Sequence, residues 1–553
     1  LRIGSVIIRH GSIAYNQRDI ASAAGVFSPQ HIGISNLSAH IALHHLTDND
    51  IHLSIKKIAF TDKSGLQVKN LRFKVNADKH QARLSDFQLE LPKSHLLLED
   101  LIATYRTNEK GTLISETLQF EGGIKPSLIT LSDVACFAPI LRKWNDALYI
   151  DTHFSGTSTS ARIHQLHFKT QSGSILLKAN AKASDWNRKL HWLANIETLR
   201  VSDEGVEQIA ANLGSKVKIP KEVLRLGNIY YKGVASGKGK SQIGTKGVLR
   251  TDAGNVEIDA HQNGKQLYAQ VDTKGINLGK ILDNAKLGII AAHIIAQGTK
   301  EHLVAKGEIP LFDFNTYRFS NIRLNGSYNK GLIDGLASIA DPNINLQVAG
   351  KYSIPKKQYE AQLNLAHLQP TVLGVKMADN TYTLNDIRVS AKNEGADSYL
   401  DLEAPFANIH VKGQYDYGTL VQTMTNMLAS KLPTLPGIGK TSNKARNNFS
   451  IEAEIASTEI LQRMLGVPLD ILQPLVIDGN ISDLDRSVNL TAQLPAFSYN
   501  GSDYSGGSLQ MNTEGDTLKV DAHIKTGAAG STSPTLHVKA AAADNTLMAS
   551  LGY

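Results

Sequence analysis

The segment Ile344–Val348 has the sequence Ile-Asn-Leu-Gln-Val, and Tyr359–Leu365 has the sequence Tyr-Glu-Ala-Gln-Leu-Asn-Leu. Both segments alternate an apolar residue with a polar one. Because successive side chains of a β-strand point to opposite faces, each segment predicts a strand with one aliphatic and one polar face. This pattern is typical of antiparallel sheets with one face in water. Parallel sheets buried on both faces show continuous apolar runs instead.

The same alternation recurs along the chain. Further examples are Ile51–Ile55, Val256–Ala260, Leu267–Val271, Phe449–Ile455 and Leu518–Ile524. Sequences that favour tight turns separate such segments. They are Asp62–Gly65, Asn263-Gly264, Asn325-Gly326, Asn500-Gly501 and Glu514–Asp516. Short connections predict that strands adjacent in sequence pair with each other in a meander.

Short helical segments interrupt the strands at intervals. The strands that precede them end near Ile196, Ile276, Leu365 and Ile455, which are 80, 89 and 90 residues apart. The helical segments expected after them are Val206–Leu213, Ile276–Leu282, Val372–Gly374 and the stretch up to Leu465. Leu128–Phe137, continuing to Trp144, is an earlier copy. A spacing of this size predicts repeated structural units of strands and a helix.

The clearest helix is expected from Asp416 to Leu432, because its apolar residues fall on one helical face. It is either an amphipathic lid or a plug that packs on the sheet. The Pro- and Gly-containing stretch after it predicts a linker. We therefore expect four parts: strands at 1–127, repeating strand–helix units at 128–432, a linker at 433–448 and further strands at 449–553.

The composition and motifs favour no catalytic chemistry. The net charge is +7, without a basic stripe carrying interleaved aromatics, so nucleic-acid binding is not expected. Gly239-Lys-Ser and Gly439-Lys-Thr lack the upstream glycine of a phosphate-binding loop. Cys136 is the single cysteine, and we expect it to be a small buried apolar residue. The sequence predicts no enzyme, no cofactor and no metal site.

Three passages resemble the TamB/AsmA-like envelope proteins of Gram-negative bacteria, especially the TamB type. They are Leu128–Leu141, Gly275–Gly288, and Ala340–Val348 with Leu363–Leu368. The resemblance covers essentially the whole chain through soft patterns. The chain begins at Leu1 without a signal sequence, so we expect an internal fragment of a longer protein.

The resemblance implies an elongated, curled antiparallel β-sheet, a repeating β-groove interrupted by short α-helices. It further implies a non-enzymatic periplasmic protein that transports phospholipid between the inner and outer membranes and supports outer-membrane biogenesis. Its partners would be phospholipid acyl chains, an outer-membrane barrel-assembly protein of the TamA/BamA kind, and the inner membrane through an anchor outside this fragment.

Acyl chains would contact the aliphatic side chains of the alternating strands. The candidate groove-lining residues are Ile51, Leu53, Ile55, Val256, Ile258, Leu267, Val271, Ile344, Leu346, Val348, Leu363, Leu365, Ile451, Ile455, Val520 and Ile524.

Two other interpretations fit the same alternation. The chain could form tandem β-sandwiches of about 90 residues, each closing its own core, as in structural or adhesin proteins. It could also be a scaffold or chaperone that offers a sheet edge to incoming strands of outer-membrane proteins.

Overall fold

A computed structural model describes residues 4–17, 19, 23–47, 50–144, 146–212, 219–239, 241–416, 419–434 and 446–552. The chain divides into two units, Leu1–Ala285 and Lys286–Tyr553, which we call unit 1 and unit 2. The predicted finer division into four parts stays a prediction. Most of the predicted linker, residues 435–445, lies outside the described residues.

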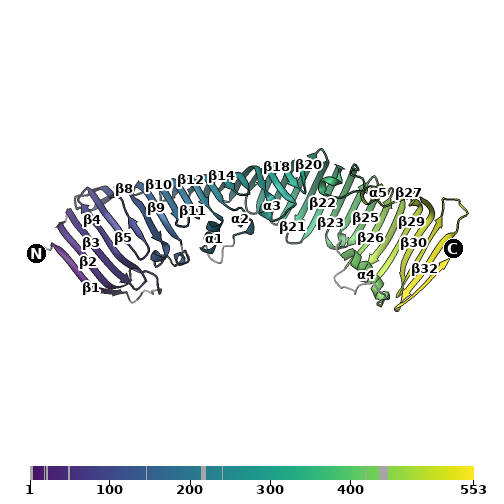
Figure 1. Ribbon diagram of the computed structural model, residues 1–553, viewed down its shortest axis with the longest axis horizontal. Helices are drawn as coiled ribbons and strands as arrows, with labels where there is room; N and C mark the ends of the chain where they lie inside the picture. The colour runs from purple at the N-terminus through teal and green to yellow at the C-terminus, as the bar shows by residue number, and fades with distance from the viewer. Residues whose placement is uncertain are drawn as a thin grey trace. The chain divides into compact units, whose positions relative to one another are not determined.

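The strands of unit 1 lie side by side in chain order (Figure 1). They are β1 (Ser5–Asn16), β2 (His31–Thr47), β3 (Asp50–Asp62), β4 (Gln67–Ala77), β5 (Gln81–Glu90), β6 (His95–Leu97), β7 (Leu101–Thr107), β8 (Leu113–Thr130), β9 (Ala147–Thr157), β10 (Ser160–Thr170), β11 (Ile175–Ser184), β12 (His191–Val201), β13 (Ile229–Lys238), β14 (Gln242–Thr251), β15 (Gly254–Asn263) and β16 (Gln266–Asn277).

The strands of unit 2 follow the same arrangement (Figure 1). They are β17 (Leu287–Gly298), β18 (His302–Phe314), β19 (Tyr317–Asn329), β20 (Leu332–Asp341), β21 (Ile344–Ser353), β22 (Gln358–Leu368), β23 (Leu384–Asn393), β24 (Tyr399–Ala404), β25 (Ala407–Gln414), β26 (Asn448–Ile455), β27 (Leu469–Ile471), β28 (Leu475–Ser482), β29 (Ser487–Tyr499), β30 (Ser502–Glu514), β31 (Thr517–Thr526), β32 (Thr535–Ala543) and β33 (Thr546–Gly552).

Within each unit, the described strands pair antiparallel with their neighbours in the chain. The exceptions occur at two short strands, β6 and β27. There, β5 pairs with β7 as well as with β6, β26 pairs with β28, and β27 pairs with β29. The predicted fold class is confirmed: the protein is mostly β, with antiparallel strands and short helices. The alternation of side chains is the cause, since it makes one face apolar on every strand.

Most predicted turns are found between strands. Asn500 and Gly501 join β29 to β30 with φ of 50° and 79°, the left-handed conformation that a tight hairpin requires. The turn predicted at Asn325-Gly326 is wrong, because both residues lie within β19. Gly326 lies directly opposite Ala305 and Gly335 on neighbouring strands.

Helical segments follow strand ends at the predicted places. Unit 1 contains η1 (Leu131–Val134), η2 (Pro139–Lys143), α1 (Asp203–Asn212), α2 (Lys221–Leu224) and α3 (Leu278–Leu282). Unit 2 contains η3 (Pro370–Leu373), η4 (Gly395–Asp397), α4 (Leu420–Lys431) and α5 (Glu459–Leu465). The start of α3 shows the local cause: the side chain of Asn277 accepts a hydrogen bond from the Lys280 N–H at 2.9 Å.

Among the described residues, four clusters of buried apolar side chains form the core, and each joins strands to a helical segment or the loop beside it. Val372 of η3 packs with strand residues of unit 2, and Met427 and Leu432 of the α4 region pack with β28, β29, β31 and β32. In unit 1, Cys136 is buried as predicted, and Val206 of α1 packs on β11 and β12. Helical segments thus cover parts of the apolar face in both units.

Within the described residues, no helix has the length and apolar character needed to cross a bilayer.

Asp341 fixes the end of β20 to the strands beside it. Its carboxylate, 4% exposed, accepts hydrogen bonds from the Ser320 N–H at 2.9 Å, the Ser320 hydroxyl at 2.7 Å and the Asn343 N–H at 3.0 Å. The Tyr317 hydroxyl donates a further bond to it. Burial alone would raise the pKa of the Asp341 carboxyl, but these hydrogen bonds together hold that pKa below its ordinary value.

Asp341→Asn should therefore lower the free energy of unfolding at pH 7 by about 1–3 kcal/mol, since an amide NH₂ would face hydrogen-bond donors. A depressed pKa stabilises the fold above the ordinary value of about 3.9, and this contribution is lost as the pH falls through the folded-state pKa. Urea unfolding between pH 7 and pH 3 should show the difference between wild type and variant shrinking in acid. A difference that is constant with pH would contradict the assignment.

Candidate functional site

The strand register places the candidate residues of unit 2 on one face of its sheet. Residues directly opposite each other on paired strands point to the same face. Leu346 lies opposite Leu365, and Val348 opposite Leu363. The pairing continues strand by strand to Ile451 on β26 and Val520 on β31. We call this the apolar face of unit 2 and the opposite one its polar face.

A row of small residues crosses seven strands of this apolar face. Each member lies directly opposite the next, from β17 to β23. The small-residue row consists of Ala296, Ala305, Gly326, Gly335, Gly350, Ala361 and Ala391. Because strands are spaced by about 4.8 Å, the row is roughly 29 Å long. It runs across the strands, and thus along the sheet.

Larger side chains flank the row on both sides. One flank is the aliphatic row, which consists of Ile294, Leu324, Val348, Leu363 and Val389. The other is the tyrosine row, which consists of Tyr328, Ile333, Tyr352 and Tyr359. Members of all three rows line a hollow of 560 Å³, which we call the first hollow. This volume falls within the range of small-molecule sites.

The glycines leave the first hollow open. A Cβ atom built on Gly326 or Gly335 would meet only a backbone oxygen, at 3.6 Å and 3.7 Å, which is ordinary contact. Both positions therefore have room above them. On the tyrosine row, Ile333 and Tyr352 are each 41% exposed, so this apolar surface is in contact with water.

The first hollow is closed on one side only. Where β22 ends, Val372 of η3 packs with Ile344 and Phe319, and Ile344 is 3% exposed. We call this the η3 side. On the opposite side, the tyrosine row lies next to the turns 299–301, 330–331 and 354–357. Each of these turns joins two described strands directly, without a helical segment between them.

A second hollow of 420 Å³ lies on the same face near the C-terminal end of unit 2. Its lining includes Leu494, Gly507, Leu509, Ile524 and Leu536. Here the buried cluster lies at the opposite strand ends, because α4 follows β25 and packs with Val488 and Leu518. The covered side of the apolar face thus changes between the two hollows.

The predicted residues of unit 2 differ in their surroundings. Val348 lines the first hollow and Ile524 lines the second. Ile344 and Leu365 are buried in the cluster beneath η3, and Leu346 and Leu363 pack against that cluster. The others are half-buried on the same face. They are Ile451, Ile455 and Val520. Contact of any of these residues with lipid stays a prediction.

In unit 1 the predicted residues also share one face, because the register connects β3 to β16 through directly opposite residues. The row is Ile51, Ala77, Ala82, Ala103, Phe120, Gly156, Ala161, Ala183, Trp192, Gly237, Ile243, Gln262 and Leu267. Leu53 and Ile55 extend it on β3, and Val256, Ile258 and Val271 extend it on β15 and β16.

Aromatic rings fill this row of unit 1 where glycines occur. A Cβ atom on Gly156 would clash with the ring of Phe120, and one on Gly237 would clash with the ring of Trp192. The space that stays open above the glycines of unit 2 is therefore occupied here.

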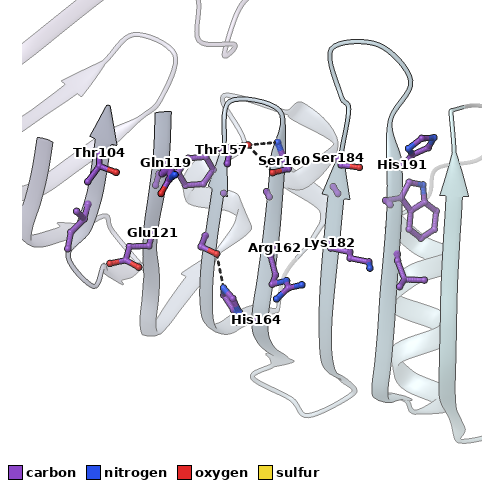
Figure 2. A pocket seen from close by; sticks show the side chains of 18 residues that line it. Thr104, Gln119, Glu121, Thr157, Ser160, Arg162, His164, Lys182, Ser184 and His191 are labelled. Carbon is purple, nitrogen blue, oxygen red and sulfur yellow. Dashed lines mark hydrogen bonds between the residues drawn. The ribbon is translucent and has the colours of Figure 1, made fainter. Parts of the chain in front are cut away.

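A hollow of 830 Å³ in unit 1 is lined mostly by polar residues (Figure 2). Arg162 and Lys182 point into it from neighbouring strands, with Glu121 farther along. The Ser155 hydroxyl hydrogen-bonds to Nε2 of His164 at 2.7 Å, an arrangement found in Ser–His nucleophile pairs. His164 is exposed and Ser155 is half-buried, and among the described residues no carboxylate hydrogen-bonds to the His164 ring. We therefore assign no catalytic role to this hollow.

Acidic residues line another hollow, of 720 Å³, on the polar face of unit 2. The alternating carboxylates at Asp401 and Glu403, and at Glu452 and Glu454, are brought together there by the register of β24, β25 and β26. Asp401 pairs with His410. No group of three or more His, Cys, Asp or Glu residues among those described has a geometry that would hold a metal ion.

Sequence reasoning missed the small-residue row and the tyrosine row. The available signal was the repeated Gly-x-Tyr of Gly326–Tyr328 and Gly350–Tyr352, which occurs in two strands of the same direction. Because Asn325-Gly326 is also a hairpin signal, the first Gly-x-Tyr overlaps a predicted turn. Glycine in a strand often marks a place where something else approaches the backbone closely.

No protein-family model, characterised protein or solved structure matches this chain. The assignment of a function therefore depends on the geometry and chemistry of the site.

The packing of α4 bears on whether it is a lid or a plug. Met427 is 5% exposed within its cluster, whereas the adjacent Leu428 is 38% exposed. Met427→Ala should destabilise the docking of α4 by about 2–4 kcal/mol, and Leu428→Ala by less than about 1 kcal/mol. Hydrogen exchange of the amides of α4 and β29 measures the effect. Equal protection in the two variants would show that α4 is a loosely held lid.

Proposed function

We propose that this protein binds lipid acyl chains along its apolar face, without catalysis. The observation that carries the proposal is the first hollow: a row of glycine and alanine flanked by aliphatic and tyrosine side chains, open to solvent on one side. A soluble domain rarely leaves a contiguous apolar surface of this kind unfilled unless it has an occupant.

The dimensions of the row suit a linear hydrocarbon. An acyl chain lying along the small-residue row would contact backbone and Cβ atoms below it and the two flanking rows beside it. Burial of one methylene contributes about 0.8 kcal/mol, so a dozen methylenes in half contact would contribute on the order of 5 kcal/mol. No specific polar contact is needed for binding of this strength.

The pairing of the strands favours an open face over tandem β-sandwiches. A sandwich requires a second sheet that packs face to face on the first. In unit 2, described strands pair in chain order, and the buried clusters combine strands with short helical segments. The apolar face is therefore covered only where such a segment packs on it.

The cellular role follows from the resemblance to TamB/AsmA-like proteins. Of the three passages that carried the resemblance, the first contains η1, the second contains α3, and the third lies in β20, β21 and β22, directly before η3. We propose on this basis that the protein acts in the periplasm and carries phospholipid between the inner and outer membranes. The parent chain would supply an inner-membrane anchor and meet an outer-membrane assembly protein.

Lipid that copurifies with the protein provides the first test. Native mass spectrometry and extraction of the purified chain should find bound phospholipid, in amounts that fall on washing with detergent. A chain that is free of lipid after isolation, and that takes up none from vesicles of bacterial phospholipid, would contradict the proposed function.

A charge in the first hollow should abolish uptake without unfolding the protein. Ile333→Asp places a carboxylate on the tyrosine row, where an acyl chain would have to desolvate it. Leu332→Asp is the matched control, because Leu332 is the adjacent residue of β20, is 43% exposed and points to the polar face. Uptake of a fluorescent fatty acid by the first hollow should fall at least about tenfold in the first variant only.

Both variants should retain the far-UV circular dichroism of the wild type, since each residue is already exposed to water. Equal loss of uptake in Ile333→Asp and Leu332→Asp would show that the fatty acid does not bind along the apolar face.

Filling the small-residue row should have the same effect by a steric route. Gly335→Leu places a side chain in open space, and replacing glycine in a strand should raise stability by about 0.5–1 kcal/mol. Asp334→Leu adds the same side chain to the polar face of the same strand. Lipid uptake should fall in the first variant while its melting temperature rises or stays unchanged. Unchanged uptake would mean that no acyl chain lies over Gly335.

A further inference from the structure

Lysines cluster at the open side of the first hollow. The turns that join β17 to β18, β19 to β20 and β21 to β22 contain Lys300, Lys330, Lys356 and Lys357, which we call the lysine rim. All four side chains belong to exposed residues. Each of these turns lies within a few residues of a member of the tyrosine row, or of the residue paired with that member. The lysines and the aromatic side chains therefore lie at the same strand ends.

The backbone holds the three turns against each other. The Lys330 N–H donates to the Glu301 carbonyl at 2.9 Å, and the Ile354 N–H donates to the Gly331 carbonyl at 2.9 Å. A Cβ atom on Gly331 would be 3.1 Å from the ring of Pro355, so these two turns are in contact. The lysines of separate hairpins are thus parts of one continuous rim.

The charges of the rim are largely uncompensated. None of the four lysines has an ion-pair partner among the described residues, and Glu301 is the one acidic residue in these three turns. The nearby Glu394 is paired with Lys392 at 2.5 Å. That pairing, with a smaller contribution from the charge of Lys356, holds the pKa of Glu394 below its ordinary value.

The η3 side has a different character. Asp313 is paired there with Arg318 at 2.7 Å, and Asp341 accepts the hydrogen bonds described above. Phe312, Phe314 and Phe319 pack beside these residues. A polar group directed to the η3 side would face the aromatic side chains and the Asp313 carboxylate, whereas one directed past the tyrosine row would face the lysine rim.

We propose that the lysine rim binds the phosphate of a phospholipid whose acyl chain lies on the small-residue row, and that the first hollow prefers lipids with a net negative headgroup. The inference rests on the proposed function. Ammonium groups bind phosphate as point charges, and tyrosine suits a boundary at which one end of a ligand is apolar and the other is wet. Four mobile cations select for charge rather than for one headgroup structure.

The test uses the full chain and three fluorescent probes with identical acyl chains: phosphatidylglycerol, phosphatidylcholine and diacylglycerol. Each probe is offered in vesicles of unlabelled phosphatidylcholine, and the amount bound to the protein is measured at low and at physiological salt. The rim variant is Lys330→Gln, Lys356→Gln and Lys357→Gln combined. The control combines Lys232→Gln, Lys274→Gln and Lys412→Gln, which remove the same charge from exposed positions that do not line the first hollow.

Wild type should bind phosphatidylglycerol more tightly than diacylglycerol, and salt should weaken this preference. The rim variant should lose about tenfold in its affinity for phosphatidylglycerol while diacylglycerol binding changes less than about twofold. The control should match the wild type for all three probes. Circular dichroism and melting temperature verify that the variants fold alike.

Other outcomes separate the two proposals. Equal binding of phosphatidylglycerol by wild type and rim variant, with diacylglycerol bound by both, would overturn the rim and leave acyl-chain binding intact. Binding of no probe by the wild type would overturn the proposed function itself. The wild type could also show saturable binding of inorganic phosphate that the rim variant loses, while lipid binding is the same in both. That result would assign the rim to free phosphate and overturn its role as a headgroup site.

Discussion

A sheet with one apolar face must cover that face, and the way in which this protein does so determines the rest of its structure. Alternation supplies every strand with an aliphatic side, and the hydrophobic effect requires that side to leave water. A second sheet would satisfy the requirement uniformly. Short helical segments satisfy it only locally, because the described ones have at most 12 residues and pack near the strand ends beside them. The apolar surface between these segments is what remains for a ligand.

In unit 2, the positions of η3 and α4 determine which strand ends of the apolar face are covered beside each hollow. η3 seals one set of strand ends by packing Val372 against Ile344, and α4 seals the opposite set farther along by packing Met427 against Val488. Polar anchors fix both arrangements. Asp341 ties strand ends together near η3, while the buried Asn447 side chain donates to Thr423 of α4 at 2.6 Å. The sides on which the apolar face meets water are therefore built into the fold.

The period-two pattern was sufficient to predict the strands, their antiparallel pairing and the face that carries Leu346, Val348, Leu363 and Leu365, because these follow from local geometry. It was not sufficient to predict which of them are exposed. Ile344 and Val348 occupy equivalent positions in one strand, yet only Ile344 lies beneath η3. Cover of that kind depends on contacts between residues far apart in the chain.

The glycines illustrate the same limit. Gly326 was expected in a turn, since Asn-Gly is a strong hairpin signal, and only the pairing with Gly335 reveals its position in a strand. Likewise, the aromatic rings over Gly156 and Gly237 cannot be predicted from the spacing of residues in the sequence. The residues that lie on a face are therefore predictable from sequence, whereas the places where that face is hollow or filled by side chains are not.

The small-residue row has a consequence for motion. Gly326, Gly335 and Gly350 present almost the same backbone surface at each strand, so a hydrocarbon displaced by one strand spacing exchanges one set of contacts for a nearly equivalent set. No protruding side chain marks a preferred stopping point. Contacts with the sheet would thus keep a bound hydrocarbon from leaving the face. They would allow it to diffuse along the row, because the contacts change little from one strand to the next.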